Sequence, residues 1–178
     1  MALLGTGSKA YLMLANGRIF EGKSFGATGT TIGETVFTTN MVGYQETLTD
    51  STYYGQVIVQ TFPLIGNYGV NDEDFESSKV SARGYVVREW CDTPSNFRSQ
   101  GNIDDFMKTN NVIGIYDIDT RALTRIIRDE GTMNCLITTE DIYAKKDEFL
   151  KAITEYTIVD AVKNTTSKEK KAYTYEHA

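Results

Sequence analysis

The chain has 178 residues, of which 40% are hydrophobic and 24% charged, the composition of an ordinary globular domain. Its 18 lysines and arginines against 24 aspartates and glutamates give a net charge of −6, which argues against nucleic acid as the main partner. The single histidine, His177, lies next to the C-terminus, which excludes a packed Ser-His-Asp triad, a Cys-His pair or a histidine-ligated metal site.

The N-terminus and the two cysteines indicate a cytoplasmic protein. Residues 1–5 lack the basic and long apolar regions of a signal peptide, and no run reaches the roughly 18 apolar residues of a membrane span. Cys91 and Cys135 form no CxxC motif, and the apolar neighbours of Cys135 predict a buried thiol. We therefore expect reduced cysteines, no metal and no membrane contact.

The first half of the chain predicts mostly strands, after a loose leader over residues 1–9. Asn16-Gly17 lies between two apolar runs and predicts a hairpin whose two central turn residues both have positive φ. Three glycines between residues 24 and 33 indicate a loop or an irregular strand. Runs rich in β-branched residues predict further strands at residues 34–39, 56–61 and 85–87. Residues 71–78 are acidic and are expected to form a solvated loop.

The second half alternates helices and strands. Helical spacing of apolar residues predicts helices over residues 102–110, 120–130 and 141–153, with short strands at 112–116 and 134–138. Asp119 or Thr120 is expected to cap the second helix, and Gly131 to end it. Residues from 164 onward are poor in large aliphatic side chains and predict a linker or frayed end. The whole is a mixed, strand-rich α/β or α+β domain.

One motif formally matches a phosphate-binding loop. Residues 17–24 read Gly-Arg-Ile-Phe-Glu-Gly-Lys-Ser, but that chemistry needs a glycine-rich loop followed by a helix that starts at the lysine. Ile19 and Phe20 fit the second strand of the hairpin, and the residues after Ser24 are poor helix formers. The context favours a hairpin strand over a nucleotide site built on Gly22, Lys23 and Ser24.

Arginines share one face of the helix expected after Asp119. Arg121, Arg125 and Arg128 have the spacing that brings side chains together on a helix surface. Such a face binds an anion or an acidic partner, or it is a solvated face that pairs with Asp117, Asp129 or Glu130. For a single helix of mixed charge, the solvated face is the favoured interpretation.

The segment from residue 40 to 53 is dense in polar and aromatic side chains and has no simple periodicity. Loops of this kind often carry function, and Asp50 followed by Ser51 and Thr52 is also a good turn or helix cap. Composition alone leaves the functional and the structural interpretation equally open.

Residues 38–50, Thr-Thr-Asn-Met-Val-Gly-Tyr-Gln-Glu-Thr-Leu-Thr-Asp, resemble the N-terminal domain of the small, glutamine-hydrolysing subunit of carbamoyl phosphate synthetase. Further matches follow in the order of the family, across about residues 11–163. They are Gly-Ala-Thr-Gly at 26–29, Thr-Phe-Pro-Leu-Ile-Gly-Asn-Tyr-Gly at 61–69, Ser-Asn-Phe-Arg at 95–98 and Asp-Ile-Asp-Thr-Arg-Ala-Leu-Thr-Arg at 117–125.

The resemblance implies a fold and a set of partners. The fold is a three-layer β/β/α domain of the swivelling type over residues 10–163. The partners are the large synthetase subunit, which uses ATP and magnesium to make carbamoyl phosphate, and a class I glutamine amidotransferase domain that supplies ammonia through an internal tunnel. The domain itself is expected to hold no cofactor, and the pathway served is pyrimidine or arginine synthesis.

The amidotransferase part of the family pattern is missing. Neither cysteine lies in its nucleophile motif, and the one histidine is in the tail. Residues 164–178 are therefore expected to lead towards a missing domain, with this chain a truncated or split front portion that is inactive by itself. Its expected role is to dock on the large subunit and to frame the glutaminase site.

One family residue is carried over by position. A serine in the family motif Thr-Asp-Pro-Ser-Tyr contacts glutamine, and here residues 49–53 read Thr-Asp-Ser-Thr-Tyr. Thr52 stands at the serine position and keeps a hydroxyl, while Ser51 replaces the proline. Asn40, Met41 and Asp50 are expected near the same domain junction, and the Arg121, Arg125 and Arg128 face becomes a candidate docking surface.

Two other functions compete with this one. The chain is alternatively a stand-alone protein-binding module, acting as a homodimer. A third hypothesis, a small nucleotide-binding enzyme, depends on the motif that ends in Lys23 and Ser24.

Overall fold

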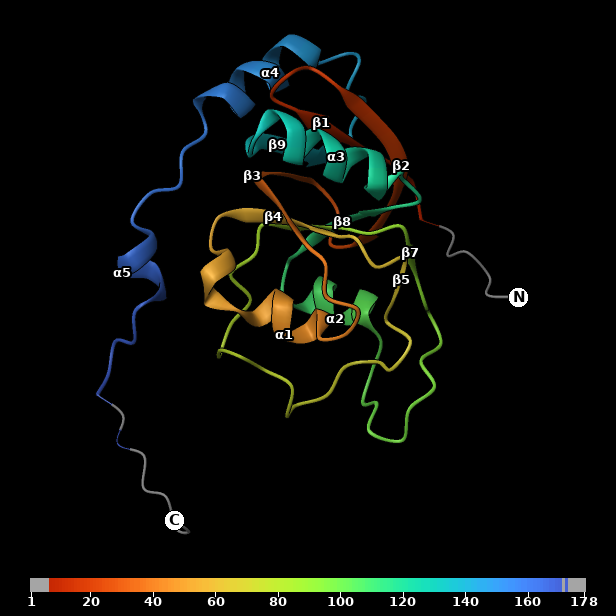
Figure 1. Ribbon diagram of the computed structural model, residues 1–178, viewed down its shortest axis with the longest axis vertical. Helices are drawn as coiled ribbons and strands as arrows, with labels where there is room; N and C mark the ends of the chain where they lie inside the picture. The colour runs from red at the N-terminus through yellow and green to blue at the C-terminus, as the bar shows by residue number, and fades with distance from the viewer. Residues whose placement is uncertain (1–6, 171, 173–178) are drawn as a thin grey trace.

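A computed structural model of the chain describes residues 7–170 and 172, in which strands and helices build a mixed α/β domain (Figure 1). His177, residues 1–6 of the expected leader, and residues 171 and 173–178 of the expected tail lie outside the described residues. The strands are β1 Lys9–Leu14, β2 Ile19–Gly26, β3 Thr30–Thr38, β4 Gln56–Gln60, β5 Leu64–Ile65, β6 Gly84–Val86, β7 Glu89–Trp90, β8 Ile113–Tyr116 and β9 Met133–Thr138. The helices are α1 Tyr44–Thr49, the 3₁₀ turn η1 Ser51–Tyr53, α2 Ile103–Thr109, α3 Thr120–Glu130, α4 Lys146–Glu155 and α5 Ala161–Thr165.

Seven strands close into a barrel in the order β1-β2-β8-β6-β4-β3-β9, and β9 pairs back onto β1. Four neighbours, β3, β4, β6 and β8, are parallel to one another, whereas β1, β2 and β9 pair antiparallel. Closure leaves no free edge among these seven strands, so their backbone donors and acceptors are paired within the sheet. The short β5 and β7 form a separate parallel pair.

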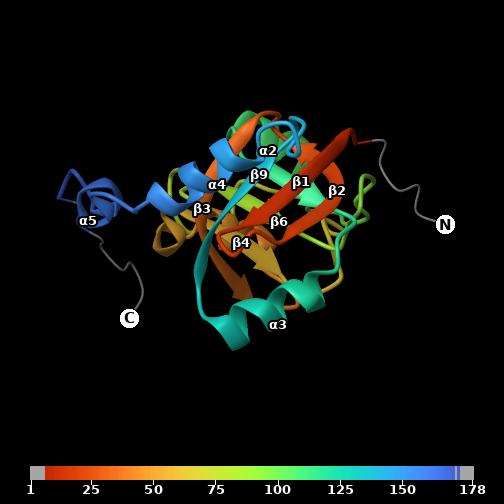
Figure 2. The same cartoon turned by 90° about the horizontal axis from the view of Figure 1, so that it is seen from above.

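The two faces of the strands bury separate hydrophobic clusters, because successive side chains of a strand point to opposite sides. Leu12 and Leu14 of β1 belong to the inner cluster, to which α3 contributes Leu123 and Ile127. The neighbouring Met13 belongs to an outer cluster that α4 covers. A third cluster lies under α1 and α2, which occupy the lower end of the barrel in Figure 1. Seen from above, α3 and α4 flank the strands, and α5 stands apart from them (Figure 2).

The predicted hairpin is confirmed, but the expected turn type is wrong. The Gly17 N–H donates to the Leu14 carbonyl at 2.9 Å, and the Leu14 N–H donates to the Arg18 carbonyl at 2.9 Å. Gly17 alone has a positive φ, of 82°, and Asn16 does not. The loop is therefore a three-residue connection with a left-handed glycine, in which only that one position needs glycine.

The helices expected in the second half are present: α3 has the expected bounds, and α2 and α4 have shifted ends. α2 begins after Asn102, whose side chain accepts the Asp105 N–H, and α3 begins after Asp119, which caps Ala122 in the same way. α4 begins only at Lys146, five residues after the predicted start, because 141–145 form turns. Two helices were not predicted: α1, and α5, which includes residue 164. The short strands β5 and β7 were not predicted either.

No helix among the described residues is long and apolar enough to cross a membrane.

The burial of Cys135 predicts a difference in reactivity between the two thiols. Cys135 is 0% exposed, and burial raises the pKa of its thiol to about 12, whereas Cys91 is partly exposed. Because the thiolate is the reacting form, we expect a disulfide-exchange reagent at pH 8 to label Cys91 in the native protein and Cys135 only after unfolding. A Cys91→Ser variant is the control: a native-state reaction of this variant as fast as in urea would contradict the buried thiol.

Candidate functional site

The connection between β3 and β4 carries the segment that sequence analysis singled out. β3 and β4 are parallel, with Thr35 opposite Val57, so the chain must return along the barrel before β4 begins. It does so through α1 and η1, which are joined at Asp50. The Asp50 carboxylate accepts the Thr52 N–H at 2.9 Å, so the predicted cap at Asp50 is present and sets the start of η1.

Tyrosines and amides fix the start of α1 below the barrel. The Tyr68 hydroxyl accepts the Gly43 N–H at 2.6 Å, and the two rings of Tyr44 and Tyr68 stack with centroids 4.3 Å apart. Desolvation raises the pKa of Tyr44, which stays neutral and donates to the Gly69 carbonyl at 2.6 Å. These contacts hold α1 against the loop that follows β5.

A buried amide pair makes the strongest link between α1 and that loop. Gln45 is 1% exposed; its Nε2 donates to the Asn71 carbonyl at 2.5 Å, and its Oε1 accepts the Asn71 N–H at 2.9 Å. The Asn71 side chain in turn accepts the N–H groups of Glu73 and Asp74. Every polar atom of the Gln45 side chain thus has a partner, which is what burial of an amide requires.

The end of α1 ties down the next part of the loop. The Thr49 hydroxyl donates to the Gln45 carbonyl at 2.9 Å and accepts the Glu76 N–H at 3.0 Å. The Ser77 hydroxyl donates to the Thr49 carbonyl at 2.6 Å. Glu76 and Ser77 are therefore placed beside η1 although they are far from it in sequence.

An acidic hollow of about 340 Å³ lies at this junction and contains two of the predicted site residues, Asn40 and Asp50. Glu46 and Glu76 line it as well, and Glu46 Oε2 is buried without a hydrogen-bond partner among the described residues. Carboxylates accept hydrogen bonds, so the hollow suits a ligand group that donates them, such as an amine or amide. Met41 is 68% exposed at the entry to the same segment.

Thr52 occupies the tip of η1 and lines neither this hollow nor the next one. It is exposed, and its hydroxyl makes no hydrogen bond with any described residue. Its neighbours on either side border different hollows: Tyr53 lines the acidic one, and Ser51 lines a second one. The free hydroxyl is available to a molecule or domain outside this chain.

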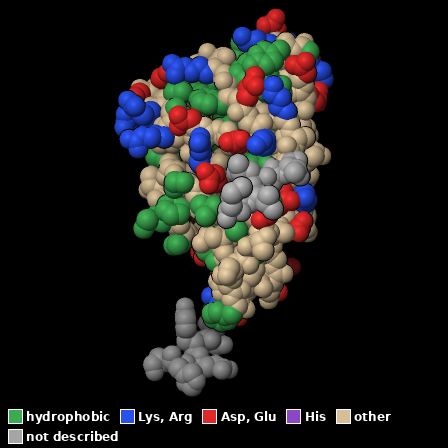
Figure 3. All heavy atoms as spheres, turned by 90° about the vertical axis from the view of Figure 1, so that its right-hand side faces the viewer, with side chains coloured by type: hydrophobic (Ala, Val, Ile, Leu, Met, Phe, Trp, Pro, Cys, Tyr) green, Lys and Arg blue, Asp and Glu red, His purple; other side chains and the backbone are tan. Residues whose placement is uncertain are grey.

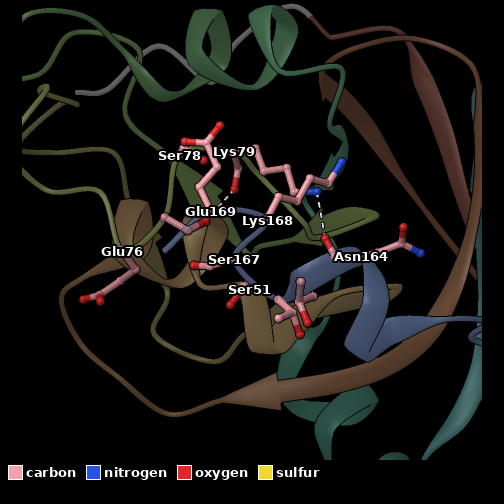
Figure 4. A pocket seen from close by; sticks show the side chains of 11 residues that line it. Ser51, Glu76, Ser78, Lys79, Asn164, Ser167, Lys168 and Glu169 are labelled. Carbon is pink, nitrogen blue, oxygen red and sulfur yellow. Dashed lines mark hydrogen bonds between the residues drawn. The ribbon is translucent and has the colours of Figure 1, made fainter. Parts of the chain in front are cut away.

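The second hollow, of about 590 Å³, lies between the 76–79 loop and the C-terminal segment (Figure 4). Lys79 donates to the Asn164 carbonyl at 3.0 Å, and the Asn164 amide donates to the Tyr54 hydroxyl at 2.9 Å. Earlier in the same segment, the Tyr156 hydroxyl donates to the Gly55 carbonyl at 2.8 Å. The C-terminal segment is thus bound beside the end of η1, at Tyr54 and Gly55.

The arginine face is present on α3 and lies away from α1 (Figure 1). Arg121, Arg125 and Arg128 are all exposed. Lysine and arginine side chains gather at the upper left of Figure 3, which is the side that faces the viewer in Figure 1. Arg128 pairs with Asp129 at 2.8 Å. Neither Arg121 nor Arg125 has an ion pair within the described residues.

The phosphate-loop match is a hairpin strand, as expected. Ile19–Gly26 is β2, and the chain enters β3 at Thr30 with no helix between. Lys23 forms an ion pair with Asp117 at 3.1 Å instead of closing a phosphate cradle. Nothing in this geometry supports the nucleotide-binding hypothesis.

Four residues of the junction were not predicted: Gln45, Glu46, Asn71 and Glu76. No sequence signal places residues 71–78 beside α1, because their acidic composition is equally typical of a free loop. The only sequence signal for Gln45 is its position between the apolar residues Tyr44 and Leu48, which weakly indicates burial. In the structure all three side chains are buried on α1.

Comparison with known proteins defines the class to which the chain belongs. Residues 12–137 match the sequence family described as carbamoyl-phosphate synthase small chain, CPSase domain. The chain is 52% identical over 134 residues to the carbamoyl phosphate synthase small chain of Syntrophotalea carbinolica, and 55% identical over 131 residues to that of Thermosynechococcus vestitus. The small chain of Clostridium perfringens is 49% identical over 146 residues. The chain belongs to the carbamoyl phosphate synthase small chain family.

The matches cover most of this chain and a minor part of each relative. They take in 75%, 74% and 79% of the chain, but 36%, 34% and 42% of the three relatives in the same order. The chain therefore spans about a third to two-fifths of the length of the relatives it matches, and it corresponds to their CPSase domain.

The Gln45–Asn71 pair predicts a large cost for removing one amide. Gln45→Leu keeps the volume but leaves the buried N–H and carbonyl of Asn71 without partners, so we expect the free energy of unfolding to fall by about 2–4 kcal/mol. Urea titration followed by circular dichroism measures it. Gln100→Leu is the matched control, because Gln100 is exposed and makes one bond, to the Asp72 N–H, and about 1 kcal/mol or less is expected. Equal losses in the two variants would contradict the role of the pair.

Proposed function

We propose that this chain is the non-catalytic N-terminal domain of a glutamine-hydrolysing carbamoyl phosphate synthase small subunit. It docks on the large subunit and frames the glutaminase site and ammonia path of a following amidotransferase domain. The observation that carries the proposal is the placement of the C-terminal segment, which Lys79 and Tyr54 hold through Asn164 beside η1. A domain that continues from this segment would start next to Thr52.

The geometry of η1 supports a contact between Thr52 and glutamine. The Asp50 cap fixes the Thr52 backbone, and the exposed hydroxyl has no partner among the described residues. The neighbouring hollow offers the carboxylates of Glu46, Asp50 and Glu76 to groups that donate hydrogen bonds, and glutamine carries both an amide and an amino group. Asn40 and Met41 then belong to the surface that meets the amidotransferase domain.

The α3 arginines support the docking role. Arg121 and Arg125 are exposed and have no ion pair with described residues, so their guanidinium groups are available to carboxylates of the large subunit. Arg128 shares this face but already pairs with Asp129. This placement leaves the η1 surface free for the amidotransferase domain.

The remaining assignments follow from the family. In the proposed assembly the domain holds no cofactor, ATP and magnesium belong to the large subunit, and the protein works in the cytoplasm. The barrel and its flanking helices then form the three-layer swivelling-type domain implied by the resemblance. The chain alone hydrolyses no glutamine.

The glutamine contact predicts a defined kinetic effect. In the small subunit that carries its glutaminase domain, we expect Thr52→Val to raise the KM for glutamine about fivefold at unchanged kcat, as one lost hydrogen bond would. Thr52→Ser keeps the hydroxyl and is the control, and the 178-residue chain alone gives the baseline for ammonia release. An unchanged KM in Thr52→Val would refute the contact.

The docking surface predicts a loss of affinity for the large subunit. We expect the double variant Arg121→Ala/Arg125→Ala to raise the Kd of the subunit complex at least about tenfold, with the larger effect at low salt because exposed charges are screened. Biolayer interferometry with immobilised large subunit measures it. Lys146→Ala/Lys151→Ala on α4 removes the same charge and should bind normally; equal weakening in both would mean that net charge alone matters.

A further inference from the structure

A third hollow, of about 400 Å³, lies where four parallel strands begin. Thr31 stands at the start of β3, Tyr54 precedes β4, Arg83 precedes β6, and Asn111 precedes β8. The parallel order of these strands brings their N-terminal ends to one side of the barrel. The hollow is therefore built from segments that the sheet holds in place.

The charge of this hollow is opposite to that of the protein as a whole. Its lining includes Lys79 and Arg83 but no aspartate or glutamate, in a chain of net charge −6. The acidic hollow beside α1 contains three carboxylates and no basic residue. The two hollows thus differ in the sign of the charge that they attract.

Arg83 is held by its backbone while its side chain is unused. Its N–H donates to the Gln56 carbonyl at 2.7 Å, and its carbonyl accepts the Thr31 hydroxyl at 3.1 Å. The guanidinium has no hydrogen bond or ion pair with any described residue, whereas Arg18, Arg98 and Arg128 are all paired with carboxylates. A rigid backbone with a free guanidinium fork suits the recognition of an oxyanion.

Ser81 contributes a second polar side chain to the wall of the hollow. It is 9% exposed and lines the hollow, and its hydroxyl is buried with no hydrogen-bond partner in the described part of the chain. A buried hydroxyl without a partner is destabilising, so such groups normally have one. Rotation of the Ser81 side chain to another rotamer is needed to turn this hydroxyl toward the hollow, where an oxygen of a bound anion would accept its hydrogen bond.

We propose that this hollow binds a small oxyanion, a phosphate or carboxylate group, through Arg83 and Ser81, with Lys79 at its rim. One of the three N–H donors of Lys79 bonds the Asn164 carbonyl, and the other two remain for the ligand. The hollow has room for an anionic group that carries a small substituent. The site shares Lys79 and Tyr54 with the contacts that hold the C-terminal segment, but Thr52 does not line it, and it does not depend on the proposed glutamine contact.

The test uses the ¹⁵N-labelled 178-residue chain titrated with sodium phosphate or with sodium acetate, at ionic strength held constant with sodium chloride. We expect saturable shifts of the amide signals of residues 81–83 and 110–111, with a Kd on the order of 1 mM. Saturation by phosphate alone assigns a phosphate site, by acetate alone a carboxylate site, and by both a general oxyanion site. Absence of saturation with either anion overturns the proposal.

Two variants and a control distinguish binding at this hollow from a general effect of the protein's positive charges. Arg83→Gln is expected to raise the Kd at least about tenfold and Ser81→Ala about threefold. Lys146→Gln removes one positive charge from α4, where Lys146 is exposed and has no ion pair with described residues, and should leave the Kd unchanged. Thermal unfolding of each variant establishes that it is folded. Equal Kd values for Arg83→Gln and the unsubstituted chain would refute the assignment.

Discussion

The parallel pairing of β3 with β4 is the constraint on which the rest of the site depends. Two parallel neighbours cannot be joined by a tight turn, so residues 39–55 must cross from the end of one strand to the start of the next. That crossover is where the family motif lies, and it carries α1, the Asp50 cap and η1. Its position below the barrel is thus fixed at both ends by strands inside a closed sheet, which suits a surface that must meet another domain.

Polar contacts hold the crossover in addition to the apolar packing of Tyr44 and Leu48. Gln45 and Thr49 are buried and bond the backbone of a loop far along the chain, at Asn71 and Glu76. Burial of polar groups is unfavourable unless each one is paired, so such a network defines one arrangement of helix and loop and disfavours others. The acidic hollow lies within this network, and its carboxylates keep their places because the backbone around them is fixed.

The sequence predicts the elements whose signals are local. Leu123 and Ile127 repeat with helical spacing and become the buried face of α3, and Asp119 caps the start of this helix as predicted. α1 escaped prediction because its buried face includes Gln45, Thr47 and Thr49, which are polar and are stable there only through partners in residues 43–77. Of the candidate site, the motif located Asn40 and Asp50, and Glu46 lies within it on α1, but Glu76 joins them only through a tertiary contact with Thr49 that no local pattern contains.

The environments of the two thiols and of the unpaired polar side chains agree with the proposed framing role. Burial raises the pKa of the Cys135 thiol to about 12, which makes it a poor nucleophile near neutral pH, and the Cys91 thiol donates to the Thr93 carbonyl. The described residues do provide groups that can contact other molecules: the Thr52 hydroxyl, the guanidinium groups of Arg121 and Arg125 on α3, and the carboxylates around one hollow. The Thr52 hydroxyl and the guanidinium groups of Arg121 and Arg125 lack partners among the described residues, and α1 and α3 lie at different places around the barrel (Figure 1). In the proposed assembly, such a domain acts through the molecules that complete those contacts.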